Sequence, residues 1–285
     1  MNRVAILGPG LLGGSLALAL RERTGAEIAV WGRRAEAVAE VAESGFADLA
    51  SVDVREVVEG ADMVVLCTPI GVMPALAGEI APALASTALV TDVGSVKGPV
   101  VRELRRIFTG NARFIGSHPM AGSERAGWSA ARANLFDGSV CIVTPDEHCA
   151  ASDVSRLSEF WKLVGCEVRY LSPDEHDEIV ALVSHLPHLI AAGLVEMIET
   201  RNPAAFDFCG LGFRDTTRVA SGPSAMWAEI LQSNRTAVRK SAEAMIEKLR
   251  EIVTLLDCDS AAAETPMNDF LTRAKARRDR LRLPS

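Results

Sequence analysis

The stretch RVAILGPGLLGGS, residues 3–15, decides the fold of the first half of the chain. An apolar run typical of a buried strand ends at Gly8, and a helical pattern begins at Leu11. The glycines between them follow G-x-G-x-x-G, which in a strand–turn–helix setting holds the pyrophosphate of a dinucleotide at the helix N-terminus. We therefore expect cofactor contacts from Gly8, Gly10, Leu11, Leu12 and Gly13. The alternative is a glycine-rich turn without a ligand.

Further apolar runs follow this first strand and alternate with helical patterns. We expect strands at residues 3–7, 27–31, 63–67, 89–92, 113–117 and 140–143, and helices at residues 11–23 and 35–44. Strands that alternate with such helices form βαβ units in a parallel sheet. Runs that are apolar throughout suit strands covered on both faces. The predicted fold class is therefore α/β, with an N-terminal Rossmann-like, doubly wound parallel sheet.

After about residue 170 the pattern changes to long segments of helical periodicity, at residues 174–200 and 223–256. This change predicts a C-terminal all-helical domain. We place the boundary near residue 168, which gives an NAD(P)-binding domain at residues 1–168 and a helical substrate and dimerisation domain at residues 169–285. The apolar stripes exceed what one small helical domain can cover, so we expect a homodimer.

Composition and charge exclude several classes of partner. The formal net charge of −7 disfavours nucleic acid and anionic membranes, and the basic residues 273–282 lack the interleaved aromatics of a nucleic-acid arm, so we expect a solvated helix there. No signal-peptide pattern and no run of about 18 apolar residues occurs, which predicts no membrane span. The six cysteines lack metal-ligand or disulfide spacing, so we expect no metal site and a cytoplasmic protein.

The end of the second predicted strand indicates which dinucleotide binds. A carboxylate at that position would bond the ribose 2′-hydroxyl of NAD. Here the strand runs into Gly32-Arg33-Arg34 instead. Guanidinium groups suit a 2′-phosphate, so we expect NADP, with Arg33 and Arg34 as its ligands. The alternative is that both arginines are solvated and the site takes NAD or either cofactor.

Three polar segments lie at the carboxyl ends of predicted strands, where ligands of open α/β sheets bind. They are Cys67-Thr68-Pro69, the segment DVGSVK at residues 92–97, and the segment GSHPMAG at residues 116–122. Thr68 and Pro69 are expected to contact the cofactor. His118 follows a predicted strand and could exchange a proton near a nicotinamide, although a histidine that caps a turn would fit this position equally well.

Four segments give the chain a family resemblance. DVGSVKG (residues 92–98) and GSHPMAGSERAG (residues 116–127) resemble the paired signatures of prephenate/arogenate dehydrogenases, the tyrosine-biosynthesis enzymes. HLPH (residues 185–188) and GFRDTTRVASGPSAMW (residues 212–227) resemble two signatures of that family's helical domain. The four segments and the glycine loop follow the family's order over most of the chain.

The resemblance implies an oxidative decarboxylation of prephenate or arogenate. Hydride passes from the ring carbon that bears the hydroxyl to the nicotinamide, the ring carboxylate leaves as carbon dioxide, and the ring becomes aromatic. His118 matches the histidine that accepts the hydroxyl proton, and Ser95 matches a serine beside the nicotinamide that orients it. Arg218 matches an arginine that holds a substrate carboxylate. His185 and His188 match polar residues that line the substrate pocket, and Ser123 and Glu124 match positions in the loop over the site. Trp227 either lines this pocket or is a core residue.

Alternatives remain for these residues and for the function. His185 and His188 could form a metal half-site or a satisfied core pair, and Arg218 could be a surface ion-pair partner. Lys97 could contact a phosphate or simply begin a helix, and His148 and His176 are expected to be solvated because their surroundings are polar and acidic. The rival functions are a β-hydroxyacid or 6-phosphogluconate type of dehydrogenase and a non-catalytic NAD(P) sensor. The choice between prephenate and arogenate stays open.

Overall fold

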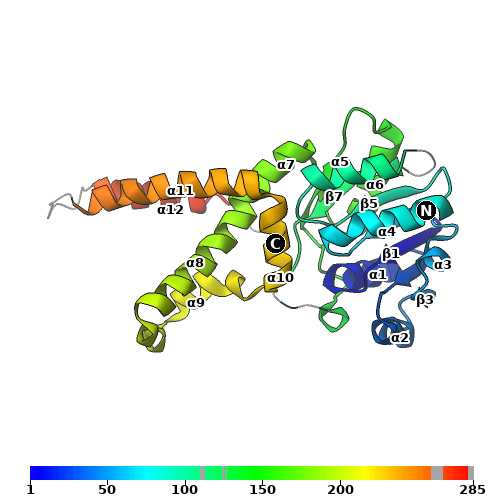
Figure 1. Cartoon of the computed structure of the whole chain (residues 1–285), viewed down its shortest axis with the longest axis horizontal. Coiled ribbons are helices and arrows are strands. Elements are labelled where there is room, and N and C mark those ends of the chain that lie inside the picture. The colour runs from blue at the N-terminus through cyan, green and yellow to red at the C-terminus, as the bar shows by residue number, and fades with distance from the viewer. Residues whose placement is uncertain (110–112, 124, 126, 258–265, 282–285) are drawn as a thin grey trace.

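The computed structural model divides the chain into an α/β body and a set of long helices that project from it (Figure 1). It describes residues 1–285 except residues 110–112, 124, 126, 258–265 and 282–285. Glu124, one of the expected substrate residues, therefore lies outside the described residues.

A six-stranded parallel sheet forms the centre of the body, in the order β3-β2-β1-β4-β5-β6. Its strands are β1 (Arg3–Leu7), β2 (Glu27–Trp31), β3 (Leu49–Ser51), β4 (Met63–Leu66), β5 (Leu89–Asp92) and β6 (Arg113–Phe114). This order is that of the doubly wound dinucleotide-binding fold, so the predicted fold class is confirmed. The short strand β3 was not predicted, because three residues carry too little pattern to recognise.

Helices cover both faces of this sheet. On β1, Val4 and Ile6 point into one hydrophobic core, whereas Ala5 and Leu7 point into the other, as the two-residue repeat of a strand requires. The first core is completed by α1 (Leu11–Arg23), α2 (Ala35–Ser44) and α6 (Ala151–Leu163), and the second by α3 (Val54–Val58), α4 (Met73–Ile80) and α5 (Gly98–Ile107). This explains why the strands are apolar throughout.

The strand predicted at residues 113–117 is in fact two strands in two sheets. After β6 the chain leaves the large sheet, and β7 (Gly116–Pro119) pairs antiparallel with β8 (Val140–Thr144), which pairs parallel with β9 (Glu167–Tyr170). Gly116 permits this crossing, because a Cβ there would lie 2.6 Å from Thr144 Oγ1. His118 consequently lies within β7, opposite Ile142, and not just past a strand as predicted.

The second half of the chain is helical, as predicted. The elements are α7 (Pro173–Val180), a π-helical turn (Ala181–His185), α8 (Leu186–Arg201), α9 (Leu211–Thr217), α10 (Ser224–Ser233), α11 (Arg235–Leu256) and α12 (Pro266–Arg278). The first three are continuous, and Ser172 and Glu175 form a capping box at their start. The predicted helix at residues 223–256 is interrupted at Asn234, whose buried side chain donates to the Asp177 carbonyl at 2.8 Å.

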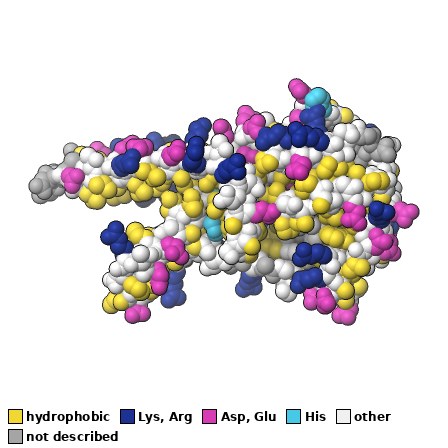
Figure 2. All heavy atoms as spheres, viewed as in Figure 1, with side chains coloured by type: hydrophobic (Ala, Val, Ile, Leu, Met, Phe, Trp, Pro, Cys, Tyr) yellow, Lys and Arg dark blue, Asp and Glu magenta, His cyan; other side chains and the backbone are white. Residues whose placement is uncertain are grey.

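The projecting helices leave much apolar surface uncovered. Buried hydrophobic residues of the described helical half are Val180, Ala181, Ala191, Ile230 and Val238. Large apolar side chains are exposed along α8 and α11, and Figure 2 shows them gathered on the side of the α11 arm that faces the α8 arm. By length and composition, residues 173–201 could cross a membrane, which differs from the sequence prediction. Only 28% of their apolar window is buried within the chain.

Candidate functional site

The glycine loop between β1 and α1 has the geometry that an anion needs. Gly8 has φ of +119° and donates its N–H to the Trp31 carbonyl at 2.9 Å, and a Cβ on Gly8 would lie 2.7 Å from the Cys67 carbonyl oxygen. A Cβ on Gly13 would collide with the Gly8 carbonyl at 2.0 Å, so α1 packs against the loop only with glycine there. Gly10 is the N-cap residue of α1 and has no side chain to cap the helix. The first N–H groups of α1, from Leu11 and Leu12 onward, are therefore available to a phosphate.

Two other features fit a dinucleotide at this edge of the sheet. The loop after β2 lies against the glycine loop, since a Cβ on Gly32 would be 3.2 Å from Pro9 Cγ, and it carries the exposed side chains of Arg33 and Arg34. After β4, the Thr68 hydroxyl is buried without a hydrogen-bond partner, next to the exposed Pro69. A buried hydroxyl without a partner is costly, so a bound polar group would complete this site.

The polar segment at residues 92–97 contains a buried ion pair. Lys97 and Asp92 are both fully buried, and the Lys97 ammonium donates to Asp92 Oδ2. The same carboxylate accepts from the N–H of Gly94 at 2.8 Å and from the N–H of Ser117 at 3.2 Å. These bonds fix β5 against β7. Lys97 immediately precedes α5 as its N-cap residue, as one of the two alternatives had it, and its side chain is a buried structural cation.

His118 is buried, and among the described residues the hydrogen bond of its ring is made by one nitrogen, Nδ1. Its Nδ1 lies 2.8 Å from His176 Nε2, and His176 Nδ1 lies 2.8 Å from Asp177 Oδ1. Burial, with the charges of His176, Lys97 and His185 in support, holds the pKa of His118 well below 6.5. Burial also lowers the pKa of His176, although the hydrogen bond to Asp177 opposes this.

The expected solvation of His176 is wrong. Its side chain is fully buried, whereas the side chain of His148 is 58% exposed, as predicted. Acidic neighbours in sequence were misleading, because α7 turns Glu175 to solvent while it turns His176 and Asp177 toward the α/β body. Asp177 accepts from the N–H groups of Lys97 at 2.7 Å and Gly98 at 2.8 Å, and so caps α5 from the helical half.

The HLPH segment and the tryptophan of the fourth segment lie together. His188 stacks on Trp227 with ring centroids 3.7 Å apart, and His185 meets the same indole edge-on at 6.2 Å. His185 Nδ1 lies 3.2 Å from Asn234 Nδ2, while His185 Nε2 and His188 Nδ1 are buried without a partner. Burial lowers the pKa of His185 to about 4 and also lowers that of His188, against a hydrogen bond to the Val219 carbonyl. These side chains therefore present neutral rings.

The remaining expected residues are less buried. Arg218 begins a short 3-10 helix (Arg218–Ser221) and has an exposed side chain. Ser123 is exposed and accepts from the N–H of Arg125 at 3.1 Å. Ser95 is half-buried, and its backbone carbonyl acts to raise the pKa of His185, against the larger effect of burial. The ring of His118 is hydrogen-bonded to that of His176, a partner that the sequence did not suggest.

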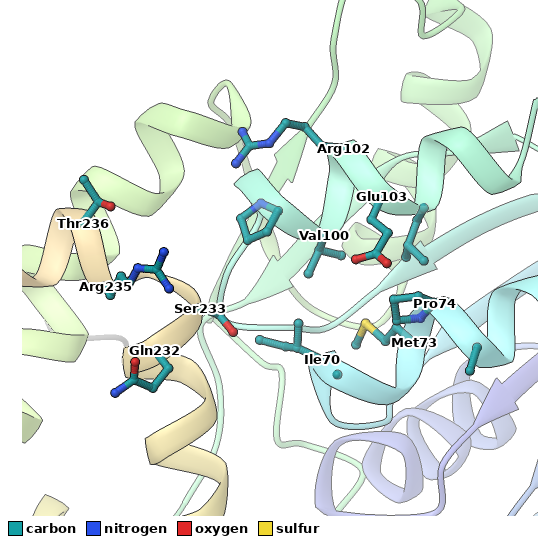
Figure 3. Close-up of a pocket in the computed structure, with 14 residues that line it drawn as sticks. Ile70, Met73, Pro74, Val100, Arg102, Glu103, Gln232, Ser233, Arg235 and Thr236 are labelled. Atoms are coloured by element: carbon teal, nitrogen blue, oxygen red, sulfur yellow. The ribbon is translucent and has the colours of Figure 1, made fainter.

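A large hollow lies apart from the histidine cluster described above. It has a volume of about 710 Å³ and opens between α4, α5, α10 and the start of α11, where Arg102, Glu103 and Arg235 line it (Figure 3). None of the histidines lines it, so the hollow is separate from the cluster around His118. Within the described ranges, no three His, Cys, Asp or Glu side chains are grouped as metal ligands would be.

Comparisons with known proteins match both halves of the chain. The model of the prephenate dehydrogenase nucleotide-binding domain matches residues 16–170, and that of the prephenate dehydrogenase dimerization domain matches residues 172–269. Cyclohexadienyl dehydrogenase of Zymomonas mobilis is 33% identical over 261 residues, which cover 90% of this chain and 88% of that protein.

Two solved structures have the same architecture over nearly the whole chain. Prephenate dehydrogenase from Aquifex aeolicus, in complex with hydroxyphenyl propionate and NAD+, is 31% identical with a TM-score of 0.90, and 98% of each chain is covered. Arogenate dehydrogenase from Synechocystis is 29% identical with a TM-score of 0.83, and 97% of this chain and 99% of that chain are covered.

Proposed function

Because the chain belongs to the prephenate dehydrogenase family, we propose that His118 is the base that accepts the ring-hydroxyl proton of its substrate. The protein is an NAD(P)-dependent oxidoreductase that carries out the oxidative decarboxylation of prephenate or arogenate. One observation carries the assignment of the base. His118 is the buried imidazole at which segments of both halves meet, since Lys97 of the body and His176 and His185 of the helical half are all near enough to affect its pKa.

The role of His118 follows from its protonation state. A group whose pKa lies well below 6.5 is neutral at pH 7, so it can accept a proton. The bound NAD(P)+ supplies the hydride acceptor. Aromatisation of the ring provides most of the driving force, so the protein has to position the ring and remove the hydroxyl proton.

The substrate side of the site is proposed from the neighbours of His118. His185, His188 and Trp227 offer an aromatic wall with two unpartnered ring nitrogens, which suits a ring that carries polar substituents. Arg218 would hold a carboxylate, because a guanidinium binds carboxylates through paired hydrogen bonds. Ser95 would lie beside the nicotinamide, and Ser123 and Glu124 belong to the loop proposed to cover the ring.

We propose that NADP is preferred over NAD. The loop after β2 carries Arg33 and Arg34 and lacks the carboxylate that would bond a ribose 2′-hydroxyl. The contacts to the pyrophosphate would come from the loop of Gly8, Gly10 and Gly13 with Leu11 and Leu12, and Thr68 and Pro69 would lie along the rest of the dinucleotide.

The functional form is proposed to be a homodimer of two-domain chains, divided near residue 168. Exposed apolar side chains on α8 and α11 support this, because a second copy that covered them would also explain a helix apolar enough for a membrane. The five described cysteines are free thiols, which fits a cytoplasmic location. The rival dehydrogenase classes and the sensor are not favoured, since both family models match the chain in order.

The function is tested by reduction of nicotinamide, followed by absorbance with prephenate and arogenate, each paired with NAD+ and NADP+. We expect reduction in at least one pairing, and its absence in all four would refute the function. His118→Asn should lower kcat by about 10²–10⁴-fold with nearly unchanged cofactor affinity. His148→Asn, on the exposed histidine, is the matched control and should retain full activity. A normal kcat for His118→Asn would remove His118 as the base.

The cofactor preference has its own test. Arg33→Ala should weaken binding of NADP+ more than that of NAD+, by about tenfold for one lost charge-assisted contact. Arg250→Ala, on the distant helix α11, serves as the control and should change neither. Equal weakening of both cofactors by Arg33→Ala would contradict a 2′-phosphate contact.

A further inference from the structure

We propose that His176 and Asp177 are positioning residues that hold the imidazole of His118 in the one tautomer able to accept a proton from the substrate. The proposal rests on His118 as the base. It concerns two residues of α7 that reach the reacting atoms only through His118, and it assigns a direction to each hydrogen bond between them.

The directions follow from the donors around Asp177. Both carboxylate oxygens accept backbone N–H groups, Oδ1 from Lys97 and Oδ2 from Gly98. A backbone N–H can only donate, so the Asp177 carboxylate is an acceptor at both oxygens. The third contact of this carboxylate, between Oδ1 and His176 Nδ1 at 2.8 Å, therefore takes its proton from the histidine.

The tautomer of His176 then sets that of His118. A neutral imidazole that donates from Nδ1 accepts at Nε2. His176 Nε2 lies 2.8 Å from His118 Nδ1, so His118 donates from Nδ1 to His176. The lone pair of His118 is consequently left on Nε2, the nitrogen that has no partner in this chain of hydrogen bonds. That nitrogen is the one free to accept the substrate's hydroxyl proton.

The same arrangement supports the charge that forms on His118. When Nε2 gains the proton, the ring becomes a cation in a buried site, where burial and the Lys97 ammonium oppose the charge. The anions in this region are Asp177, behind His176, and Asp92, which is already paired with Lys97. Asp177 is thus the carboxylate that offsets the new charge through the bridging ring of His176. The Nδ1 proton stays on His118 throughout.

The arrangement also couples the two halves of the protein. Asp177 caps α5 in the α/β body while it orients His176, and its backbone carbonyl accepts from Asn234 at the interruption between α10 and α11. Helix α7 can therefore orient His118 only when it is docked on the body. The orientation of the base therefore depends on the contact between α7 and the α/β body.

Substitutions at His176 separate orientation from packing. The Oε1 of a glutamine can accept from His118 Nδ1–H, whereas leucine cannot. His176→Leu should lower kcat by about 10²–10⁴-fold, the usual contribution of a positioned general base, because the tautomer of His118 is then no longer fixed. His176→Gln should recover at least tenfold of this loss, with KM and cofactor affinity near those of the unmodified protein in both variants. His148→Gln is the control.

A direct measurement does not depend on either variant. The ¹⁵N shifts of the His118 ring, in the unmodified protein with the cofactor bound, should show a protonated Nδ1 and an unprotonated Nε2. The opposite tautomer would overturn the proposal, as would a normal kcat in a folded His176→Leu. A normal kcat in His176→Leu with an inactive His118→Asn would contradict the positioning role alone. Normal activity in both would instead remove His118 as the base.

Discussion

The two halves of the chain bury their apolar side chains to very different extents. In the α/β body, strands such as β1 and β4 are almost completely buried, and two hydrophobic cores lie on opposite faces of one sheet. In the helical half, Leu249 and Val253 of α11 are 46% and 58% exposed. One chain therefore suffices to complete the nucleotide-binding fold, whereas the helical half needs a further surface to cover it.

The largest effect is expected when charges are placed on the exposed apolar stripe of α11, the surface proposed to be covered by a second copy. Leu249→Glu with Val253→Glu would bury two carboxylates in the proposed interface, at a cost of several kcal/mol. We expect dimer affinity to fall by about 10³-fold or more, measured by light scattering after gel filtration. Arg239→Gln with Lys240→Gln makes the same change in net charge on exposed positions of α11 and should leave the dimer intact. A double Glu variant that remains dimeric would contradict the proposed interface.

The second prediction concerns the stability of the α/β body. Lys97→Met removes one partner of a fully buried ion pair and leaves the Asp92 carboxylate without its cation. The free energy of unfolding should fall by about 3–5 kcal/mol, as measured by denaturant titration with nucleotide-domain probes. A loss below about 1 kcal/mol would show that Asp92 is adequately solvated by its backbone donors.

The third prediction concerns pH, because the histidines at the junction of the halves are held neutral. His118, His176, His185 and His188 all have lowered pKa values, so the unfolded chain binds more protons below pH 6.5 than the folded chain does. The free energy of unfolding is therefore highest above that pH and falls as the pH falls. At pH 5.5 the decrease is about 1 kcal/mol for each fully buried ring. Denaturant titrations at pH 7.5 and 5.5 measure this. Equal stability at both values would show that the rings charge freely.

The smallest effect is expected on the outer surface of the helical half. Lys248 and Glu251 form an ion pair on α11, with side chains 50% and 63% exposed. Lys248→Met should change the free energy of unfolding by no more than about 0.5 kcal/mol, because exposed pairs are screened by solvent. Set beside Lys97→Met, this variant measures how much burial contributes to a pair of the same chemistry. A loss as large as that of Lys97→Met would contradict this view.

Much of the fold could be predicted because the apolar runs and the glycine spacing are local signals. The strands at Arg3–Leu7 and Glu27–Trp31 and the helix at Leu11–Arg23 occur at the predicted residues. The split between β6 and β7 could not be predicted, since residues 113–117 form one continuous run in sequence. The space near Thr144 that requires Gly116 exists only after folding.

The candidate site was only partly predictable. The segments around His118, His185 and Trp227 were recognised from their sequence, but His176 and Asp177 were missed because their acidic setting suggested solvent. A helical repeat offered a clue, since Asp177, Ala181 and His185 recur at intervals of four and are all buried. That clue becomes decisive only when α7 is known to pack against Lys97 and Gly98.

The sequence by itself determined the doubly wound sheet, the dinucleotide loop and the change to helices, because hydrophobic periodicity and glycine spacing act over a few residues. Tertiary structure decided which nitrogen of His118 is free, which carboxylate stands behind it and which apolar faces remain uncovered. These properties depend on residues 58 or more positions apart, such as His118 and His176. Contacts of that range have no signature in the local pattern, since only the packed chain brings their atoms within hydrogen-bond distance.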